Sequence, residues 1–180
     1  MAEMKIRSIG AGEARALAEA LAEVLMDCVA GGASVSFTAP LSKARATQFW
    51  MGVADEVERG NRILLIAESD GGRVAGTVQI VTGQPENQPH RADVSKLLVH
   101  RDFRRHGVGS KLMAEVDVVA ARSARTVLVL DTETGSDAER LYVRAGWTRA
   151  GSIPDYALRP YGGLAATTYF YKQLPPSDPR

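Results

Sequence analysis

The chain has 180 residues, which is the size of one ordinary domain. Hydrophobic residues make up 45% of it and charged residues 24%, and these values are typical of a globular protein and exclude a disordered chain. Lysine and arginine total 22 and aspartate and glutamate total 21, which leaves a formal net charge of +1. Because a nucleic-acid binder usually carries a strong basic excess, we expect no nucleic-acid partner.

The cysteine and histidine content argues against disulfides and metal sites. Cys28 is the single cysteine of the sequence, which excludes an internal disulfide and a cysteine-based zinc site and is typical of a reducing compartment. The three histidines, His90, His100 and His106, are scattered, so we expect no metal site. No apolar run approaches the ~18–20 residues of a membrane span, and the N-terminus has no signal-like apolar segment. We therefore predict a cytoplasmic protein with no membrane partner.

The first half of the chain shows two helical patterns and one hairpin pattern. Apolar residues recur at helical spacing over residues 13–30 and again over 42–59. Two apolar runs flank an Asp-Gly-Gly turn at 70–72, which is typical of a β-hairpin. In chain order we predict a strand at 5–9, a helix at 13–30, a loop at 33–41, a helix at 42–59, strands at 62–68 and 74–82, a loop at 83–90 and a strand at 92–99.

The second half of the chain alternates helices with strands. Residues 127–130 are apolar throughout, as in a strand buried on both faces, and Ser136 and Glu139 form a capping-box pattern at a helix start. We predict a helix at 107–123, a strand at 127–130, a helix at 136–145 and a last strand at 165–172. This order predicts an α/β (α+β) fold with a mixed sheet, formed by one domain over residues 1–174. The proline-rich residues 175–180 are expected to be a disordered tail.

A basic, glycine-containing stretch carries the clearest chemical signal. A strand ends at Val99, a loop follows, and a turn with Gly107 and Gly109 opens a helix. Glycine lets the main chain approach a ligand closely, and the free N–H groups of a helix's first turn attract an anion. The positive side chains around this turn are Arg101, Arg104, Arg105 and Lys111. The stretch therefore predicts a phosphate cradle, although its spacing is that of neither a Walker A loop nor a dinucleotide-binding glycine loop.

Two motifs resemble the signature of the GNAT superfamily of acyl-CoA-dependent N-acetyltransferases. The first is Arg104-x-x-Gly107-x-Gly109 between a strand and a helix, and the second is Leu-Tyr-x-x-x-Gly-Trp at 141–147. The spacing between the motifs and the preceding elements also fit that family. Further stretches are similar to the tabtoxin-resistance acetyltransferases, which N-acetylate a small β-lactam amino acid: residues 31–35, 96–97, 130–133, 135–136 and 148–151. The resemblance implies the GNAT fold, with a mostly antiparallel central sheet flanked by helices.

The resemblance also implies acetyl-CoA (coenzyme A) as the cofactor. In the family, amides of the glycine loop bind the pyrophosphate, and the preceding strand has its amides near the thioester and pantetheine. The cofactor-binding residues implied here are Leu97, Leu98, Val99, Arg104, Arg105, His106, Gly107, Val108, Gly109, Ser110 and Lys111. The alternative for the two adjacent arginines is a role as solvated surface charges. Many members carry Asn where this chain has Gly135, so that amide contact is absent here or supplied by a neighbour.

N-acetylation needs a base, because most amines are protonated at pH 7. Asp93 and Asp131 are the candidates for this role, with Asp93 placed by its parity on the same strand face as Leu97 and Val99. Asp131 lies at the C-terminal end of the neighbouring strand, where ligand sites of open α/β sheets lie. Tyr142 matches the family's general acid, which protonates the leaving thiolate, and its alternative is a core tyrosine.

Both aspartates have alternative interpretations. Asp93 could simply pair with Arg91 or Lys96 at a strand start. Asp131 could form a turn after its strand, and Glu133 is a rival for either catalytic role.

The acceptor pocket is assigned by analogy. Phe37 and Asp155 are the candidate substrate-binding residues, and a carboxylate there would suit an amine. We expect direct transfer of an acetyl group from acetyl-CoA to the primary amine of a small molecule, with an amino-acid-like toxin or antibiotic as one candidate. The alternatives are a protein or peptide N-acetyltransferase and a non-catalytic acyl-CoA-binding regulator. A homodimer with a contact near residues 165–171 is a further expectation.

Overall fold

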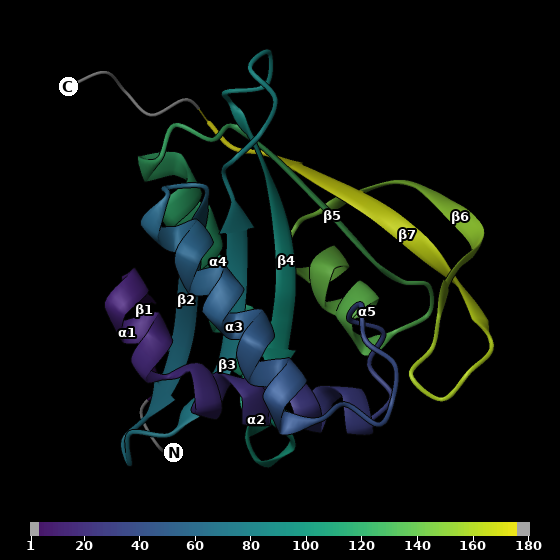
Figure 1. Ribbon diagram of the computed structural model, residues 1–180. Coiled ribbons are helices and arrows are strands. Elements are labelled where there is room, and N and C mark those ends of the chain that lie inside the picture. The colour runs from purple at the N-terminus through teal and green to yellow at the C-terminus, as the bar shows by residue number, and fades with distance from the viewer. Residues whose placement is uncertain (1–3, 176–180) are drawn as a thin grey trace.

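The computed structural model describes residues 4–175, and seven strands in this part of the chain form one sheet (Figure 1). The sheet has the order β1-β2-β3-β4-β5-β7-β6. Among these strands β4 and β5 run parallel, and every other neighbouring pair is antiparallel. The strands are β1 (Met4–Ile9), β2 (Arg62–Ser69), β3 (Val74–Val81), β4 (Arg91–Val99), β5 (Val127–Glu133), β6 (Thr148–Leu158) and β7 (Leu164–Gln173). The predicted mixed, mostly antiparallel sheet is confirmed.

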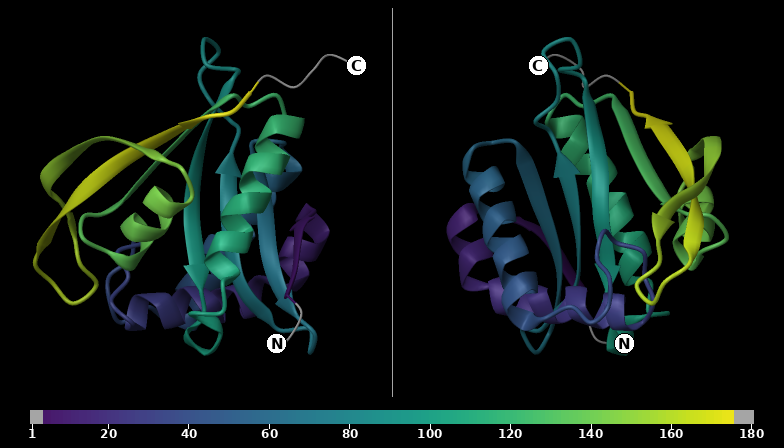
Figure 2. Two further views of the ribbon diagram at one scale, coloured as in Figure 1. Left: turned by 180° about the vertical axis from the view of Figure 1, so that it is seen from behind. Right: turned by 45° about the vertical axis from the view of Figure 1, so that its right-hand side comes forward.

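Helices cover the sheet on both faces (Figures 1 and 2). They are α1 (Ala11–Ala16), α2 (Ala18–Ala30), α3 (Lys43–Glu58), α4 (Val108–Arg122) and α5 (Asp137–Arg144), with a short 3₁₀ helix η1 (Arg101–Phe103). One buried cluster joins α1, α2 and α3 to β2 through Leu64 and Ile66. A second joins α4 and α5 to the opposite face through Leu65, Leu128 and Phe170. The sheet is thus the middle of three layers. Burial of its two apolar faces against the helices is the main contribution to folding stability.

The predicted helix over residues 13–30 is two helices in the structure. The chain bends at Leu17, where φ is −94° and ψ is 5°. The bend lets α1 bury Ala14 while α2 buries Leu21 and Leu25 along a separate axis. Alanine, leucine and glutamate are good helix formers on both sides of the bend, so local propensity carries no sign of it.

Strand β6 is absent from the sequence-based prediction. It is the edge of the sheet, pairs with β7 alone, and is exposed over almost its whole length. Pro154 and the left-handed residue Asp155 (φ 51°) lie where its pairing becomes irregular. An edge strand with two exposed faces has no alternation of apolar and polar residues, which is the pattern that identifies strands.

The prediction that residues 127–130 are buried on both faces is wrong. Leu128 and Leu130 are buried, whereas Val127 and Val129 are only half-buried. Leu128 and Leu130 face the layer of α4 and α5, whereas Val127 and Val129 belong to neither buried cluster. The face of β5 that carries Val127 and Val129 is therefore only partly covered.

A β-bulge at Lys96 reverses the side-chain alternation of β4. Thr77 of β3 pairs with Leu98 and Gln79 pairs with Ser95, so β4 has two residues where β3 has one. Lys96, the first of these two residues, has a left-handed φ of 54°. Asp93 therefore shares its face with Ser95 and Leu98. The predicted shared face with Leu97 and Val99 is wrong, because parity arguments fail across a bulge.

Strands β4 and β5 are paired only where they begin. Their register contains three residue pairs, from Arg91 with Val127 to Asp93 with Val129. Beyond these pairs the two strands diverge (Figure 1), so that β4 has no strand partner on its β5 side within residues 4–175. The main chain of a strand carries unmet donors and acceptors along such an edge, which favours occupation by another extended group.

None of the helices over residues 4–175 combines the length and apolar character that a membrane crossing requires. Residues 176–180 of the expected tail lie outside the described residues. The single domain over residues 1–174 stays a prediction.

Gly76 of β3 pairs with Val99, and the main chain of β4 leaves no room for a side chain there. A Cβ atom at Gly76 of β3 would lie 2.6 Å from the carbonyl oxygen of Leu98. We expect Gly76→Ala to lower the free energy of unfolding by about 1–3 kcal/mol, measured by urea denaturation, because main-chain atoms cannot move aside as a side chain can.

The matched control is Gly52→Ala in α3, where a Cβ atom would meet nothing within 4 Å. This variant should be neutral or more stable by up to about 1 kcal/mol, because alanine favours a helix. Equal stability of the two variants would show that the main chain at the bulge can relax.

Candidate active site

The start of α4 forms an exposed cradle of main-chain N–H groups. Gly107 caps the helix with a left-handed φ of 75°, and Arg105 just before it is also left-handed at 64°. Within the described residues, the N–H groups of residues 105–110 donate to no main-chain or side-chain acceptor. Six free donors beside the positive end of a helix dipole favour a bound anion such as a pyrophosphate. The geometry thus fits the cradle predicted from the sequence, with His106, Val108, Gly109 and Ser110 in it.

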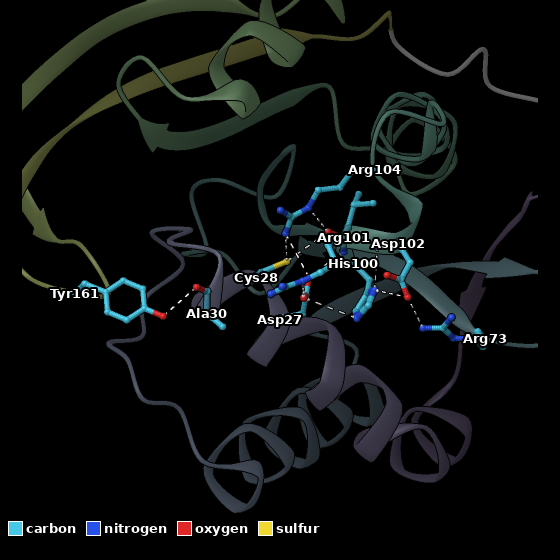
Figure 3. Close-up of polar contacts among 10 residues, drawn as sticks. Asp27, Cys28, Ala30, Arg73, His100, Arg101, Asp102, Arg104 and Tyr161 are labelled. Carbon is cyan, nitrogen blue, oxygen red and sulfur yellow. Dashed lines mark hydrogen bonds and ion pairs between the residues drawn. The ribbon is translucent and has the colours of Figure 1, made fainter.

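The turn that precedes the cradle is fixed to the end of α2 by Asp27 (Figure 3). The Asp27 carboxylate accepts the main-chain N–H of Arg101 at 2.9 Å and also pairs with the guanidinium of Arg101. The side chain of Asp27 is only 8% exposed. Burial opposes the charge of the carboxylate, but the hydrogen bonds from Arg101 and the charge of His100 outweigh it and lower the pKa of Asp27. This stabilisation is present at neutral pH and is lost on acidification below the usual aspartate pKa of about 3.9.

The guanidinium of Arg104 turns back to the protein (Figure 3). Its Nε donates to the carbonyl oxygen of Val99 at 2.9 Å, and its Nη2 lies 3.4 Å from Asp27 and 3.7 Å from the Cys28 sulfur. Arg104 therefore holds the end of β4 and the cradle against α2. Arg105 and Lys111 are exposed, and within the described residues neither has an ion-pair partner.

Residues 97–99 follow the bulge and line the unpaired edge of β4. Leu98 is buried towards α2, while Leu97 and Val99 are half-buried on the α4 face. Beyond Asp93 no strand of the described part of the chain pairs with this edge of β4 on its β5 side. An extended chain bearing amides could lie between the diverging strands.

Tyr142 projects from α5 into the core on the α4 face of the sheet. Its ring packs against Trp147 and Phe170, each at a centroid distance of 6.1 Å. The side chain is buried, and burial together with the charge of Asp131 raises the pKa of its phenol. Within the described residues its hydroxyl has no hydrogen-bond partner, which leaves the proton free for a ligand.

The two candidate carboxylates lie on the same face of the sheet but have different surroundings. Asp93 pairs with Arg91 and accepts from Gln84 Nε2 at 3.0 Å, as one of the alternative interpretations expected. Asp131 is exposed and accepts from Thr167 Oγ1 at 2.8 Å. It belongs to β5 and pairs with Tyr169 in β7, so its interpretation as a turn residue is wrong. Asp131 therefore has the freer carboxylate.

Glu133, the rival for either catalytic role, also belongs to β5. Its carboxylate forms an ion pair with Arg159 at 2.7 Å.

Two long connections meet on the acceptor side. The main-chain N–H of Ala39 donates to the carbonyl oxygen of Pro160 at 2.8 Å. The hydroxyl of Tyr161 donates to the carbonyl oxygen of Ala30 at 2.9 Å (Figure 3). The loop between α2 and α3 is thereby joined to the turn between β6 and β7, two segments that lie side by side in Figure 2. The joined loops favour a closed acceptor site.

The two predicted substrate-binding residues lie on different elements. Phe37 packs edge-on against Phe49 of α3 at a centroid distance of 5.3 Å. Asp155 is exposed on β6, and among residues 4–175 no hydrogen bond, ion pair or ring contact joins it to Phe37. The sequence analysis assigned no role to Asp27. For Lys96 it considered only an ion pair with Asp93. Their function depends on contacts with distant elements, so no motif marks them. Within residues 4–175 no three potential ligands come together as a metal site.

Comparison with known proteins identifies the family. Residues 60–149, half of the chain, match the family model described as an acetyltransferase (GNAT) domain. The chain belongs to the GNAT acetyltransferase family. The acetyltransferase is similar to a solved protein from Salmonella typhimurium, assigned as an acetyltransferase and bound to its cofactor acetyl-CoA. That protein is 19% identical, with 99% of this chain and 98% of that chain covered and a TM-score of 0.79.

Two further solved structures share the fold. The ribosomal-protein-alanine N-acetyltransferase from Brucella melitensis is 22% identical over 94% of this chain and 99% of that chain, with a TM-score of 0.78. A protein assigned as a phosphinothricin N-acetyltransferase is 20% identical over 96% and 99%, with a TM-score of 0.75. The predicted fold, the predicted acetyl-CoA-dependent N-acetyltransferase activity and the predicted cofactor are confirmed.

Asp27 should control affinity for the cofactor without touching it. We expect Asp27→Asn to raise the Kd for acetyl-CoA about tenfold in calorimetric titration, because a neutral amide holds Arg101 and Arg104 less strongly. The matched control in the same helix is Glu19→Gln, which removes an exposed ion pair with Lys43 and should leave the Kd unchanged. An unchanged Kd for Asp27→Asn would show that the cradle keeps its shape without this contact.

Proposed function

We propose that the acetyltransferase moves an acetyl group from acetyl-CoA directly to the primary amine of a small molecule within a ternary complex. The observation that carries the proposal is the run of six free N–H groups at residues 105–110, next to the edge where β4 and β5 diverge. The cradle would hold the pyrophosphate, and the unpaired edge of β4 would hold the pantetheine. The exposed cations Arg105 and Lys111 would face the remaining phosphate charge.

The reaction forms an N–C bond and breaks a C–S bond. The ammonium nitrogen loses two protons, one before the attack and one as the amide forms, while the sulfur gains one, so one proton passes to the solvent. Acetyl-CoA supplies the activated thioester. Asp131, directly or through a water molecule, would take the proton from the ammonium group of the acceptor, with Asp93 as a second carboxylate on the same face. Tyr142 would donate its proton to the departing thiolate, a role that suits a phenol whose pKa is raised.

The joined loops support a small acceptor. The contacts of Ala39 with Pro160 and of Tyr161 with Ala30 close the acceptor side, whereas a protein substrate needs an open groove. A particular closeness to the tabtoxin-resistance enzymes, and a role in antibiotic resistance, remain proposals that rest on the sequence resemblance. The Brucella relative acts on a ribosomal protein, so a protein acceptor is the second candidate.

The predicted homodimer also stays a proposal. Strand β7, which contains residues 165–171, lies between β5 and β6 and is not the sheet edge. The exposed apolar side chains nearby are Ile153, Tyr156, Leu158, Leu164 and Tyr171.

A free-thiol assay tests the function. We expect coenzyme A release from acetyl-CoA with at least one small primary amine from a panel of amino acids, β-lactam amino acids, aminoglycosides and polyamines. Tyr142→Phe should lower kcat about 100-fold or more and leave the Kd for acetyl-CoA unchanged, because only the proton donor is lost. Tyr171→Phe, an exposed tyrosine of β7, is the control and should keep full activity. Thiol release with peptides alone would favour a protein acceptor.

The two carboxylates should differ in importance. We expect Asp131→Asn to lower kcat about 100-fold and Asp93→Asn to lower it less, because Arg91 and Gln84 already occupy the Asp93 carboxylate. Both variants should bind acetyl-CoA normally by calorimetry. A larger loss of kcat for Asp93→Asn than for Asp131→Asn would show that Asp93, and not Asp131, is the base.

A further inference from the structure

Three donor side chains gather on the face of the sheet that carries Asp93 and Asp131. Arg62 of β2, Gln79 of β3 and Lys96 at the bulge of β4 form this donor cluster. The guanidinium of Arg62 donates to Gln79 Oε1, and Gln79 pairs in register with Ser95, the residue before Lys96. The positive charge of Arg62 acts directly on Lys96. None of these three residues has a part in the chemistry described so far.

The donor cluster has more donors than acceptors. Gln79 is fully buried, and its Nε2 has no hydrogen-bond partner within the described residues. The Nε of Arg62 is also buried and unpartnered. Among the residues that the structure describes, Lys96 Nζ donates only to the hydroxyl of Ser36, at 3.0 Å. Buried donors without acceptors cost free energy, so this arrangement is stable when an oxygen-rich group comes to it.

No carboxylate neutralises the donor cluster by contact. No ion pair joins Arg62 or Lys96 to an acidic side chain of the described residues. Burial and the charge of Arg62 lower the pKa of Lys96, and Asp131 opposes this only from a distance. Burial likewise lowers the pKa of Arg62, opposed by Glu56. An anion placed between these cations would relieve both effects.

The face that holds the donor cluster also borders the loop of the acceptor side. Lys96 contacts Ser36 of that loop and lies 5.9 Å from the ring of Phe49, against which Phe37 packs. The cradle belongs to α4, which packs on the opposite face through Leu112 and Val116, so the cofactor phosphates are an unsuitable partner for these cations. The charges on this face therefore divide into cations on β2 and β4 and carboxylates on β4 and β5.

We propose that the donor cluster binds a carboxylate of the acceptor, so that the acceptor is an amino acid. This inference rests on the proposed function and names the substrate class of the same site. The amine would lie towards Asp131 and the carboxylate towards Lys96 and Arg62. Lys96 is then the specificity-determining residue, because it is the member of the cluster that reaches the acceptor loop.

The test compares each of a set of free amino acids with its own carboxamide in the thiol-release assay. The two members of a pair have the same side chain and both carry an α-amine. They differ in the negative charge of the carboxylate, which the donor cluster would bind. For the wild-type enzyme we expect kcat/KM at least about tenfold higher for the acid than for its amide. Thiol release at equal rates with both members overturns the inference while leaving the proposed function intact. No release with any amine would instead count against the proposed function.

Substitution of Lys96 locates the effect. Lys96→Met should raise KM for the acid about tenfold or more, leave the values for the amide unchanged and keep the Kd for acetyl-CoA, and Lys96→Arg should restore part of the preference. Lys43→Met, which removes an exposed lysine that pairs with Glu19, is the control and should keep the full preference. An undiminished acid preference in Lys96→Met would overturn the assignment to Lys96. If Lys96→Met does not fold, Lys96→Gln, which keeps a polar side chain of similar length and removes the charge, should still weaken the preference, and an undiminished preference in that variant would also overturn the assignment.

Discussion

The brief pairing of β4 with β5 is the constraint on which the rest of the structure depends. Three residue pairs hold the strands together where they begin, and the extra residue at Lys96 then displaces β4 from a regular ladder. The result is an unpaired strand edge in the middle of a sheet, next to the start of α4. Unmet main-chain donors and acceptors are unfavourable for folding alone, and in the proposed function they bind the amides and phosphates of the cofactor.

The bulge also separates two kinds of chemistry on β4. Before it, Asp93 and Ser95 face the α3 side, and after it Leu97 and Val99 face the α4 side. One strand therefore contributes main chain to the proposed cofactor groove and charged side chains to the proposed acceptor face. An unbroken strand would have placed Asp93 with Leu97, beneath α4.

The cradle depends on an element outside its own motif. Asp27 at the end of α2 holds the main chain and guanidinium of Arg101 and contacts Arg104, so the loop has a fixed shape before any ligand arrives. Preorganisation of this kind lowers the free-energy cost of binding, because the donors need no reordering. On the acceptor side, the contact of Ala39 with Pro160 joins loops that are far apart in the sequence. Together these contacts fix the shape of the loops on both sides of the proposed site.

The sequence by itself determined most of the helices and interior strands, and it carries the motifs at residues 104–109 and 141–147, since short-range periodicity, glycine and capping patterns act within a few residues. Tertiary structure decided the bend at Leu17, the exposed edge strand β6 and the bulge at Lys96, because packing between distant elements sets them and leaves no local pattern. The same holds for Asp27 and for the donor cluster. Their partners lie on other elements, and a charge acquires a function only from the groups that folding places beside it.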